Sequence, residues 1–423
     1  MTTSIDNIKV SIIVPICNVE KYLSQALTSL CEQTHRNIEI IALNDGSTDN
    51  SITILNEFAK EDNRIIVVDK ENEGYGKTCN KGLGIASGDY IAILEPDDWV
   101  NKNMFSEMLQ FAWKKNLLEE VDGQLLPNVD IIKTPWIEVK NWNNPDKQYE
   151  SPGAMFKYIK QTKTPVTLHD CPDLIEFHPS IWTCLYKKSF LDEFKIRFPE
   201  YPGAGWADNP FLIETLYRAR SIMYLDKPFY HYRADILGST RNHNSPEKVA
   251  LPFNRWLDMT KKLEELGCDD DEIWKSHYVR GFNYIYGAIL DDGWDNPIVQ
   301  EKTNELFKIM NDELVICNPK ISKTNKIFYK EVTGCSKEIH DTMFDYLKRL
   351  TRAEITLFKQ FGLISGFRMS MSKLARKNAR RTSQKSVSEE MTQLHDNELK
   401  LDEELVNQQN KDVFKTPKTI RGL

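Results

Sequence analysis

The sequence has no paired cysteine motif, although it contains eight cysteines in 423 residues. None of them form a C-x-x-C pair, and they are scattered along the whole chain, which argues against a disulfide framework or a zinc knuckle. Reduced thiols fit a cytosolic protein best. The eight positions are Cys17, Cys31, Cys79, Cys171, Cys184, Cys268, Cys317 and Cys335.

Long apolar runs are also missing. No stretch approaches the roughly 20 apolar residues of a membrane span. Residues 1–9 have no apolar core and include Asp6, so we expect neither a signal peptide nor an anchor there. The net charge is −7 and the sequence pI is near 5.8, which excludes a general attraction to nucleic acid. We expect a cytoplasmic protein that can still lie peripherally at the inner face of the cell membrane.

What the sequence does contain is a repeating order of apolar and amphipathic segments. Apolar residues make up 40% of the chain, enough for a sizeable core. Buried-strand patterns at 10–15, 38–43, 65–68 and 90–94 alternate with helical stripes, the first of which has Asn18 as its expected cap. Further strands are expected at 181–186 and 222–225. This alternation predicts an α/β fold with a mainly parallel sheet.

The alternation stops after about residue 240, and three parts are expected. Residues 1–240 form the catalytic domain, and 241–350 form a helical appendage with aromatic stripes. Residues 351–423 form a basic amphipathic helix followed by a charged, partly disordered tail.

An acidic turn follows the fourth expected strand. Glu95, Asp97 and Asp98 stand where a buried strand ends, which is the edge where open α/β sheets bind ligands. Such carboxylates repel one another unless a cation neutralises them, and hard divalent ions prefer oxygen ligands. The alternative is an acidic turn on a solvated loop.

The turn at 44–49 and the loop at 202–210 carry two more candidate carboxylates. Asp45 lies at the mouth of the sheet, although the serine, threonine and aspartate of its turn also suit helix capping. Asp208 follows a glycine-rich loop that carries Trp206. A pocket that seats a sugar ring on an aromatic face beside a carboxylate would use all of this loop, whereas the alternative is an N-capping aspartate.

Two nucleotide-binding motifs lack essential glycines. Residues 74–78 resemble the end of a phosphate loop, but its first glycine would be position 71, which is Glu71. No G-x-G-x-x-G follows the first strand, which argues against an NAD-dependent oxidoreductase. Gly82, Gly84 and Gly88 are better explained as helix-packing and C-cap glycines.

The segment 355–388 has no acidic residue and eight basic ones, interleaved with apolar side chains. A solvated helix face is the common meaning of such a run. Attachment to an anionic lipid surface is the sharper one.

Six short motifs together resemble bacterial family 2 glycosyltransferases in order and spacing. They are I-I-V-P at 12–15, N-D-G-S-T-D at 44–49, N-E-G at 72–74, N-K-G at 80–82, G-D-Y at 88–90 and E-P-D-D-W at 95–99. The resemblance covers roughly residues 9–240. It implies a GT-A-type fold, an inverting mechanism and a nucleotide-sugar donor, usually a UDP-sugar.

The resemblance implies roles for individual residues on the donor side. Pro15, Asp45 and Asn72 match positions that hold the nucleotide base. Glu95 matches an aspartate that contacts the ribose or diphosphate, and Asp97 matches the ligand of a divalent metal, Mn²⁺ or Mg²⁺.

It also implies roles for residues later in the chain. Asp208 occupies the place of the catalytic base, with Ala207 where many members have glutamate. Arg233 and Ser239 belong to a segment similar to one that closes over the diphosphate. Trp206 would contact the acceptor.

Two departures from the family pattern bear on donor identity. Cys17 replaces a tyrosine that many members stack on the base, and Cys79 replaces an arginine. Lys77, in the same helical turn as Cys79, could supply the lost positive charge.

The expected reaction is a single displacement at the anomeric carbon, with Asp208 as general base and a metal on Asp97. The acceptor would be a hydroxyl of a cell-surface glycan or of a lipid-linked precursor. Two alternatives stay open. One is a catalytically silent nucleotide-sugar-binding module, and the other is the NAD-dependent oxidoreductase that the missing glycine motif disfavours.

Overall fold

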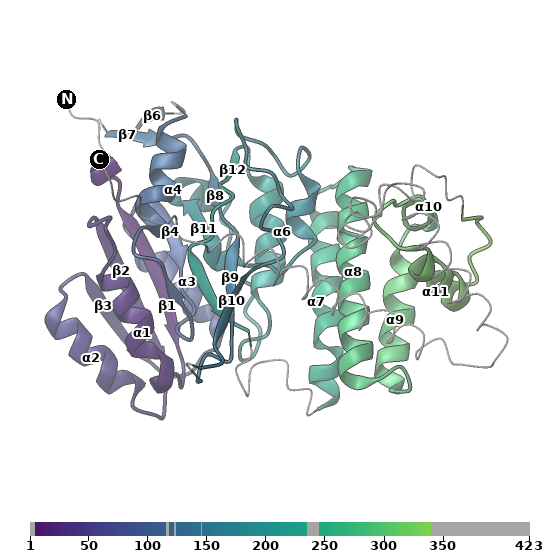
Figure 1. Cartoon of the computed structure of the whole chain (residues 1–423), viewed down its shortest axis with the longest axis horizontal. Helices are drawn as coiled ribbons and strands as arrows, with labels where there is room; N and C mark the ends of the chain where they lie inside the picture. The colour runs from purple at the N-terminus through teal and green to yellow at the C-terminus, as the bar shows by residue number, and fades with distance from the viewer. Residues whose placement is uncertain (1–4, 116–117, 122–123, 145, 235–244, 340–423) are drawn as a thin grey trace, which may run out of the picture. The chain divides into compact units, whose positions relative to one another are not determined.

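The structure is a computed structural model of the chain (Figure 1). It describes residues 5–115, 118–121, 124–144, 146–234 and 245–339. The expected roles of Ser239, of the segment 355–388 and of the part 351–423 fall outside these residues. Within them, no helix is both long and apolar enough to cross a membrane.

A seven-stranded sheet forms the centre of the N-terminal region, in the order β12-β8-β11-β4-β1-β2-β3. All pairs are parallel except those that β11 makes with β4 and β8. The strands are β1 (Val10–Ile16), β2 (Ile38–Asp45), β3 (Ile65–Lys70), β4 (Tyr90–Ile93), β8 (Ile131–Lys133), β11 (Cys184–Lys187) and β12 (Ile222–Tyr224).

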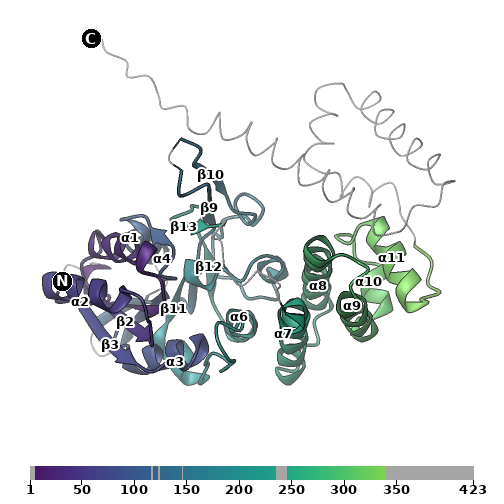
Figure 2. The same ribbon diagram turned by 90° about the horizontal axis from the view of Figure 1, so that it is seen from below.

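The central strands are buried along their whole length, as strands covered on both faces must be. Every residue of β1 and β2 is buried. Helices α1 (Glu20–Cys31) and α2 (Ser51–Glu61) follow β1 and β2, and α3 (Tyr75–Ile85) follows β3 and returns the chain to β4. Because such crossovers are right-handed, α3 lies on the face opposite α1, as Figure 2 shows.

The remaining strands form smaller sheets. A four-stranded sheet has the order β10-β9-β13-β5 and a two-stranded one pairs β6 with β7. These strands are β5 (Trp99–Val100), β6 (Leu118–Val121), β7 (Gln124–Pro127), β9 (Trp136–Lys140), β10 (Tyr149–Pro152) and β13 (Tyr230–Arg233). The helices of this region are α4 (Met104–Trp113), α5 (Lys188–Glu193) and α6 (Asp208–Arg218), with short 3-10 turns at Ile5–Asn7, Pro172–Ile175 and Ile181–Thr183.

The rest of the described chain is helical, as expected. It contains α7 (Pro246–Glu265), α8 (Asp271–Asp292), α9 (Pro297–Ile309), α10 (Asp312–Ile316) and α11 (Lys323–Thr333). Chain contacts divide the protein into two compact units. The first comprises Met1–Asn242 with Asn254–Arg280, and the second comprises His243–Phe253 with Gly281–Leu423. The first unit therefore includes part of α7 and the first half of α8. In the second, Phe307 packs against Phe282, Phe328 and Tyr329.

Three local expectations were wrong. Residue 18 does not cap α1, because the residue before the helix is Val19 and Asn18 has a positive φ of 55°. Side chains of the second turn cap α1 instead, since Asp49 accepts from Glu20 N at 3.0 Å and Ser51 from Val19 N at 3.0 Å. The strand expected at 181–186 begins only at Cys184, after the 3-10 turn. None of Gly82, Gly84 and Gly88 caps α3, because the helix ends at Ile85 and its C-cap residue is Ala86.

Gly82 and Gly84 of α3 differ in what surrounds them. A Cβ on Gly82 would lie 2.6 Å from Ile13 Cγ2 of β1, whereas nothing lies within 4 Å of one on Gly84. Gly82 therefore lets α3 approach the sheet, and Gly84 only loosens the helix.

We predict opposite effects from the same substitution at these positions. Gly82→Ala should destabilise the protein by about 1–3 kcal/mol through overpacking. Gly84→Ala should stabilise it by up to about 1 kcal/mol through helix propensity. Scanning calorimetry of both variants checks this through the midpoint of the main transition. Equal shifts in one direction would show that α3 does not depend on contact at Gly82.

Candidate active site

The turn after β2 and the turn after β3 are joined through Asp45. This buried carboxylate accepts from Glu73 N at 2.8 Å, from Gly74 N at 3.0 Å and from Lys70 Nζ. Burial acts to raise the pKa of Asp45, but the hydrogen bonds from Lys70 and Glu73 N outweigh it and the pKa is lowered. Asp45 is therefore an ionised carboxylate that fixes the shape of the third turn.

Asn72 lies against the same turn. Its Nδ2 donates to the Asp45 carbonyl at 2.9 Å and lies 3.4 Å from Cys17 Sγ. Gly46 has a φ of 66°, and a Cβ there would lie 2.7 Å from Asn72 N, so the two turns pack backbone to backbone. Two residues of the expected base-binding site, Asp45 and Asn72, are thus in contact. The third, Pro15, lies near the end of β1 and pairs with Leu43 of β2.

The acidic turn after β4 divides its carboxyl groups between two tasks. Asp98 is 1% exposed and accepts from Tyr230 Oη at 2.9 Å and from Arg233 N at 2.8 Å. Burial raises the pKa of Asp98 well above its ordinary value, and the nearby Asp97 charge adds to this. Asp98 therefore ties the turn to β13 through both of its oxygens.

Glu95 and Asp97 are the two carboxyl groups that remain. Tyr75 Oη donates to Glu95 at 2.5 Å, and burial raises the pKa of Glu95 to about 8, with the Asp97 and Asp208 charges adding to the rise. The pKa of Asp97 is raised by burial, against which its own backbone N–H and the Arg233 charge act. No described side chain donates a hydrogen bond to Asp97, so its oxygens are available to a ligand.

Arg233 lies behind this turn. It is 5% exposed, and its guanidinium donates to the Asp97 carbonyl and to Gln25 Oε1. The guanidinium carbon lies 4.5 Å from the ring centre of Trp99, 5.2 Å from that of Tyr22 and 5.3 Å from that of Trp142. In this structure Arg233 therefore supports the main chain at Asp97, and its expected contact with a diphosphate stays a prediction.

Asp208 is the first residue of α6. A helix that leads back to a parallel strand begins at the carboxyl edge of the sheet, so Asp208 lies on the same edge as the acidic turn. The residue before α6 is Ala207, so Asp208 is not the N-cap residue that the alternative explanation required. Burial raises the pKa of Asp208 to about 6, with the Arg280 charge acting in the opposite direction.

The loop before Asp208 is held in an unusual backbone conformation. Gly203, Gly205 and Trp206 have φ values of 64°, 55° and 53°. A positive φ is a true outlier for a bulky residue such as tryptophan, and such outliers concentrate at functional sites. The carbonyl of Gly203 accepts from Tyr75 N at 3.0 Å, so this loop and the first turn of α3 are joined.

The loop is also fixed from α7. The guanidinium carbon of Arg255 lies 3.4 Å from the ring centre of Tyr201, and Tyr201 Oη donates to Asp258 at 2.6 Å. Trp206 is half-buried and Lys77 is exposed in the first turn of α3. Among the described residues, Lys77 has no hydrogen-bond or ion-pair partner. Its expected role of supplying a positive charge in place of the arginine therefore stays a prediction.

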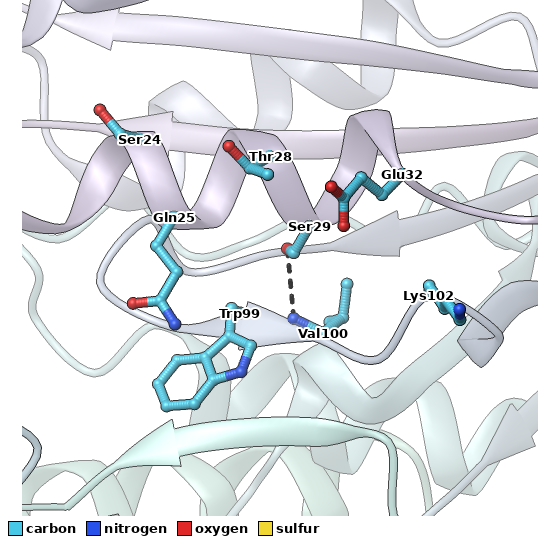
Figure 3. A pocket seen from close by; sticks show the side chains of 8 residues that line it. All are labelled: Ser24, Gln25, Thr28, Ser29, Glu32, Trp99, Val100 and Lys102. Atoms are coloured by element: carbon cyan, nitrogen blue, oxygen red, sulfur yellow. Dashed lines mark hydrogen bonds between the residues drawn. The ribbon is translucent and has the colours of Figure 1, made fainter. Parts of the chain in front are cut away.

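A surface pocket lies apart from Asp208, between α1 and β5 (Figure 3). It is lined by Ser24, Gln25, Thr28, Ser29, Glu32, Trp99, Val100 and Lys102. Trp99 is covered by a stacked His231 at 4.9 Å and by the Arg233 guanidinium, so its ring faces are already occupied. The pocket adjoins Gln25 and supports the acidic turn, but it contains none of the expected site residues.

Sequence reasoning missed Tyr75, Tyr230, Asn209 and Arg280. Tyr75 and Tyr230 bind the acidic turn from α3 and β13, a contact between segments far apart in the chain. Of these four residues, Arg280 is the one that the sequence could have indicated, because it continues the helical stripe of Ile273 and His277. All three residues are buried. A charged residue on such a face requires buried partners.

Part of the chain matches a known family profile and curated relatives. Residues 11–163 match the profile of the family described as Glycosyl transferase family 2. A putative glycosyltransferase, EpsH, of Bacillus subtilis strain 168 is 32% identical over 227 residues, which are 53% of this chain and 60% of the relative. A poly(ribitol-phosphate) beta-glucosyltransferase of Bacillus spizizenii is 28% identical over 228 residues, which are 53% of this chain and 32% of the relative.

Solved structures share the fold. The crystal structure of S. aureus TarS 1-349 has a TM-score of 0.54 at 22% identity and covers 77% of this chain and 90% of that chain. The same fragment in complex with UDP-GlcNAc has a TM-score of 0.54 at 21% identity and also covers 77% and 90%. The chain carries a family 2 glycosyltransferase domain with a GT-A-type fold.

The family 2 profile covers only part of the site. Asp45, Asn72, Glu95 and Asp97 lie inside residues 11–163, whereas Asp208 and the helices beyond it do not. The chain spans 30% to 60% of the length of the first two curated relatives. The comparisons therefore leave the activity of the whole protein to be proposed.

Proposed function

We propose that this protein is an inverting glycosyltransferase that moves a sugar from a nucleoside diphosphate donor, a UDP-sugar, to a hydroxyl group. One observation carries the proposal: the half-buried Asp208 carboxyl, with a pKa raised to about 6, lies at the sheet edge that also carries Asp97. A general base works best when its pKa is close to the working pH. The family 2 domain supports the same reaction class.

The donor side of the site is formed by the second and third turns. Asp45 orders the backbone of the third turn, where Asn72 and the Gly46 main chain would contact the nucleotide base. The neighbour solved with UDP-GlcNAc supports a UDP-sugar as donor. Glu95 would contact the ribose or diphosphate, and protonation at its raised pKa of about 8 would limit its repulsion of the phosphates.

The acidic turn fits a divalent cation whose coordination the donor completes. Among the described residues, no three histidine, cysteine or acidic side chains are grouped as metal ligands. Mg²⁺ is commonly bound by one or two carboxylates together with substrate phosphates, and Asp97 offers a carboxylate without a side-chain partner. When bound there, Mn²⁺ or Mg²⁺ would neutralise charge on the departing diphosphate.

The acceptor side is formed by the loop before α6. Trp206 would contact the acceptor sugar, and Asp208 would take the proton from its hydroxyl as the oxygen attacks the anomeric carbon. Arg255 and Asp258 hold Tyr201, and this contact keeps the loop in place over α3. A single displacement by a base-activated hydroxyl inverts the anomeric configuration. The acceptor would be a cell-surface glycan or its lipid-linked precursor.

The first prediction from this proposal concerns Asp208→Asn. Sugar transfer should fall by roughly 10²- to 10⁴-fold because the general base is lost. Wild-type turnover should rise with pH through about 6, as Asp208 loses its proton, and the variant should lose this limb. Donor affinity and melting temperature should change little, because the amide is nearly the same size as the carboxyl group and Asp208 is not the N-cap residue of α6. The exposed Asp192→Asn is the control, and near-normal turnover in Asp208→Asn would remove the base assignment.

The second prediction concerns Asp97→Ala. The dependence of UDP-sugar binding on Mn²⁺ should disappear, because the cation loses the carboxylate that would hold it on the protein. Calorimetric titration of UDP-GlcNAc with and without Mn²⁺ tests this, with Asp192→Ala as control. Metal-responsive affinity of wild-type size in the variant would contradict the assignment. Donor binding without turnover in the wild type would favour the catalytically silent module instead.

The third prediction concerns residues 355–388 and a peripheral membrane contact. Eight basic residues without an acid, interleaved with apolar ones, support binding to anionic lipid, at about 1 kcal/mol per base near the surface. The full chain should sediment with phosphatidylserine vesicles and be released by salt, and a chain ending at residue 354 should not. Equal sedimentation of the two would leave the solvated-face explanation.

A further inference from the structure

Arg280 is a buried cation of α8 that the reaction described above does not use. It is 1% exposed and belongs to the same compact unit as the sheet. It lies well outside the family 2 profile. Burying a guanidinium is costly unless its donors are satisfied, so its partners show what it is placed to do.

One of those partners, Asn209, leads to the site. Arg280 Nη1 donates to the Ile175 carbonyl at 3.0 Å, and Nη2 donates to Asn209 Oδ1 at 2.5 Å. Asn209 is 2% exposed, and its Nδ2 donates to Asp208 Oδ1 at 3.1 Å. A continuous chain of hydrogen bonds therefore joins α8 to the Asp208 carboxyl.

The chemistry of this chain sets the direction of the Asn209 amide. Arginine has only donors, so the amide oxygen must face Arg280. The amide nitrogen is then left to face Asp208 and the Trp206 carbonyl, which it approaches at 3.4 Å. Arg280 on one side and the two acceptors on the other thus specify the same direction of the amide, and Arg280 anchors its oxygen.

We propose that Arg280 is a positioning residue for the general base: acting through Asn209 it orients the Asp208 carboxyl, and it supplies the positive charge beside it. The inference rests on the proposed role of Asp208 and adds to it a contribution from the helical region. It assigns a part in transfer to a residue of α8.

The groups that face Asp208 come from four elements. They are Tyr75 and Cys79 of α3, Glu95 of the acidic turn, Tyr186 of β11 and Arg280 of α8. Burial raises the pKa of Tyr75, Cys79 and Tyr186 well above their ordinary values, so all three are neutral near pH 7.

Glu95 is an acid, and its negative charge would disfavour ionised Asp208 rather than favour it. Within the described part of the chain, Arg280 is thus the charge that favours ionised Asp208. Removing it leaves desolvation opposed only by hydrogen bonds, so the pKa of Asp208 should rise above about 6 and less of the base should be ionised at pH 7.

The test is the pH dependence of UDP-GlcNAc turnover, with Mn²⁺ present, in full-length Arg280→Met. The acidic limb should move up by about 1 to 3 pH units, the size expected for loss of a nearby opposite charge. Part of the lost turnover should return by pH 9. Arg64→Met, which removes a partly buried arginine paired with Asp62 at the far side of β3, should keep the wild-type limb. A drop of equal size at every pH would show a structural role only and overturn the inference.

Two further variants separate charge from orientation. Arg280→Lys keeps the charge but not the planar pair of donors, so its limb should stay near the wild-type pH while its maximal turnover falls. Asn209→Ala should likewise lower turnover more than it moves the limb. A limb in Arg280→Lys that moves as far as in Arg280→Met would overturn the charge assignment.

A direct titration keeps this inference separate from the proposed function. Carbon-13 NMR of labelled aspartate carboxyl groups, with Asp208→Asn to assign the signal, follows Asp208 without any turnover. A higher titration point in Arg280→Met than in wild type supports the inference, and an unmoved one overturns it. A moved titration in a protein whose wild type transfers no sugar would support the role of Arg280 and overturn the proposed function.

Discussion

Carboxyl groups that lose their water at one edge of a parallel sheet are the constraint on which the rest of this structure depends. Burial is the largest cause of the raised pKa at Glu95, Asp97, Asp98 and Asp208. Coulomb interactions between charges strengthen as water is excluded. This edge with its carboxyl groups therefore favours binding of a cation and disfavours binding of a diphosphate without one. The proposed metal, the proposed base and the supporting arginines all answer that requirement.

The protein manages this charge by giving each carboxyl group a different set of partners. Asp98 accepts hydrogen bonds from Tyr230 and from the Arg233 main chain, and these bonds fix the acidic turn. Asp45 carries out the same kind of task at the neighbouring turn, with Lys70 as its cation. Asp97 and Asp208 are left with oxygens that face the site. Rigid support by buried polar contacts is what keeps such groups in working geometry.

Much of this could be predicted from the sequence, because local patterns determine it. The parallel strands follow from continuous apolar runs, and the sheet edge then identifies the turns at Asp45 and Glu95. The long-range partners of the site could not be predicted, because Tyr230 is 132 residues from Asp98 along the chain and Arg280 is 71 residues from Asn209. The cap of α1 was wrong for the same reason, since Asp49 and Ser51 supply it from another turn.

The proposed single displacement at the anomeric carbon can be tested without knowing the acceptor. Donor hydrolysis, with water in place of the hydroxyl, should be followed by proton NMR for α-linked UDP-sugars in the presence of Mn²⁺. A single displacement inverts the anomeric carbon, so the first sugar released should be the β anomer, which then converts slowly to the equilibrium mixture. First release of the α anomer, or no release from any donor that binds, would contradict it.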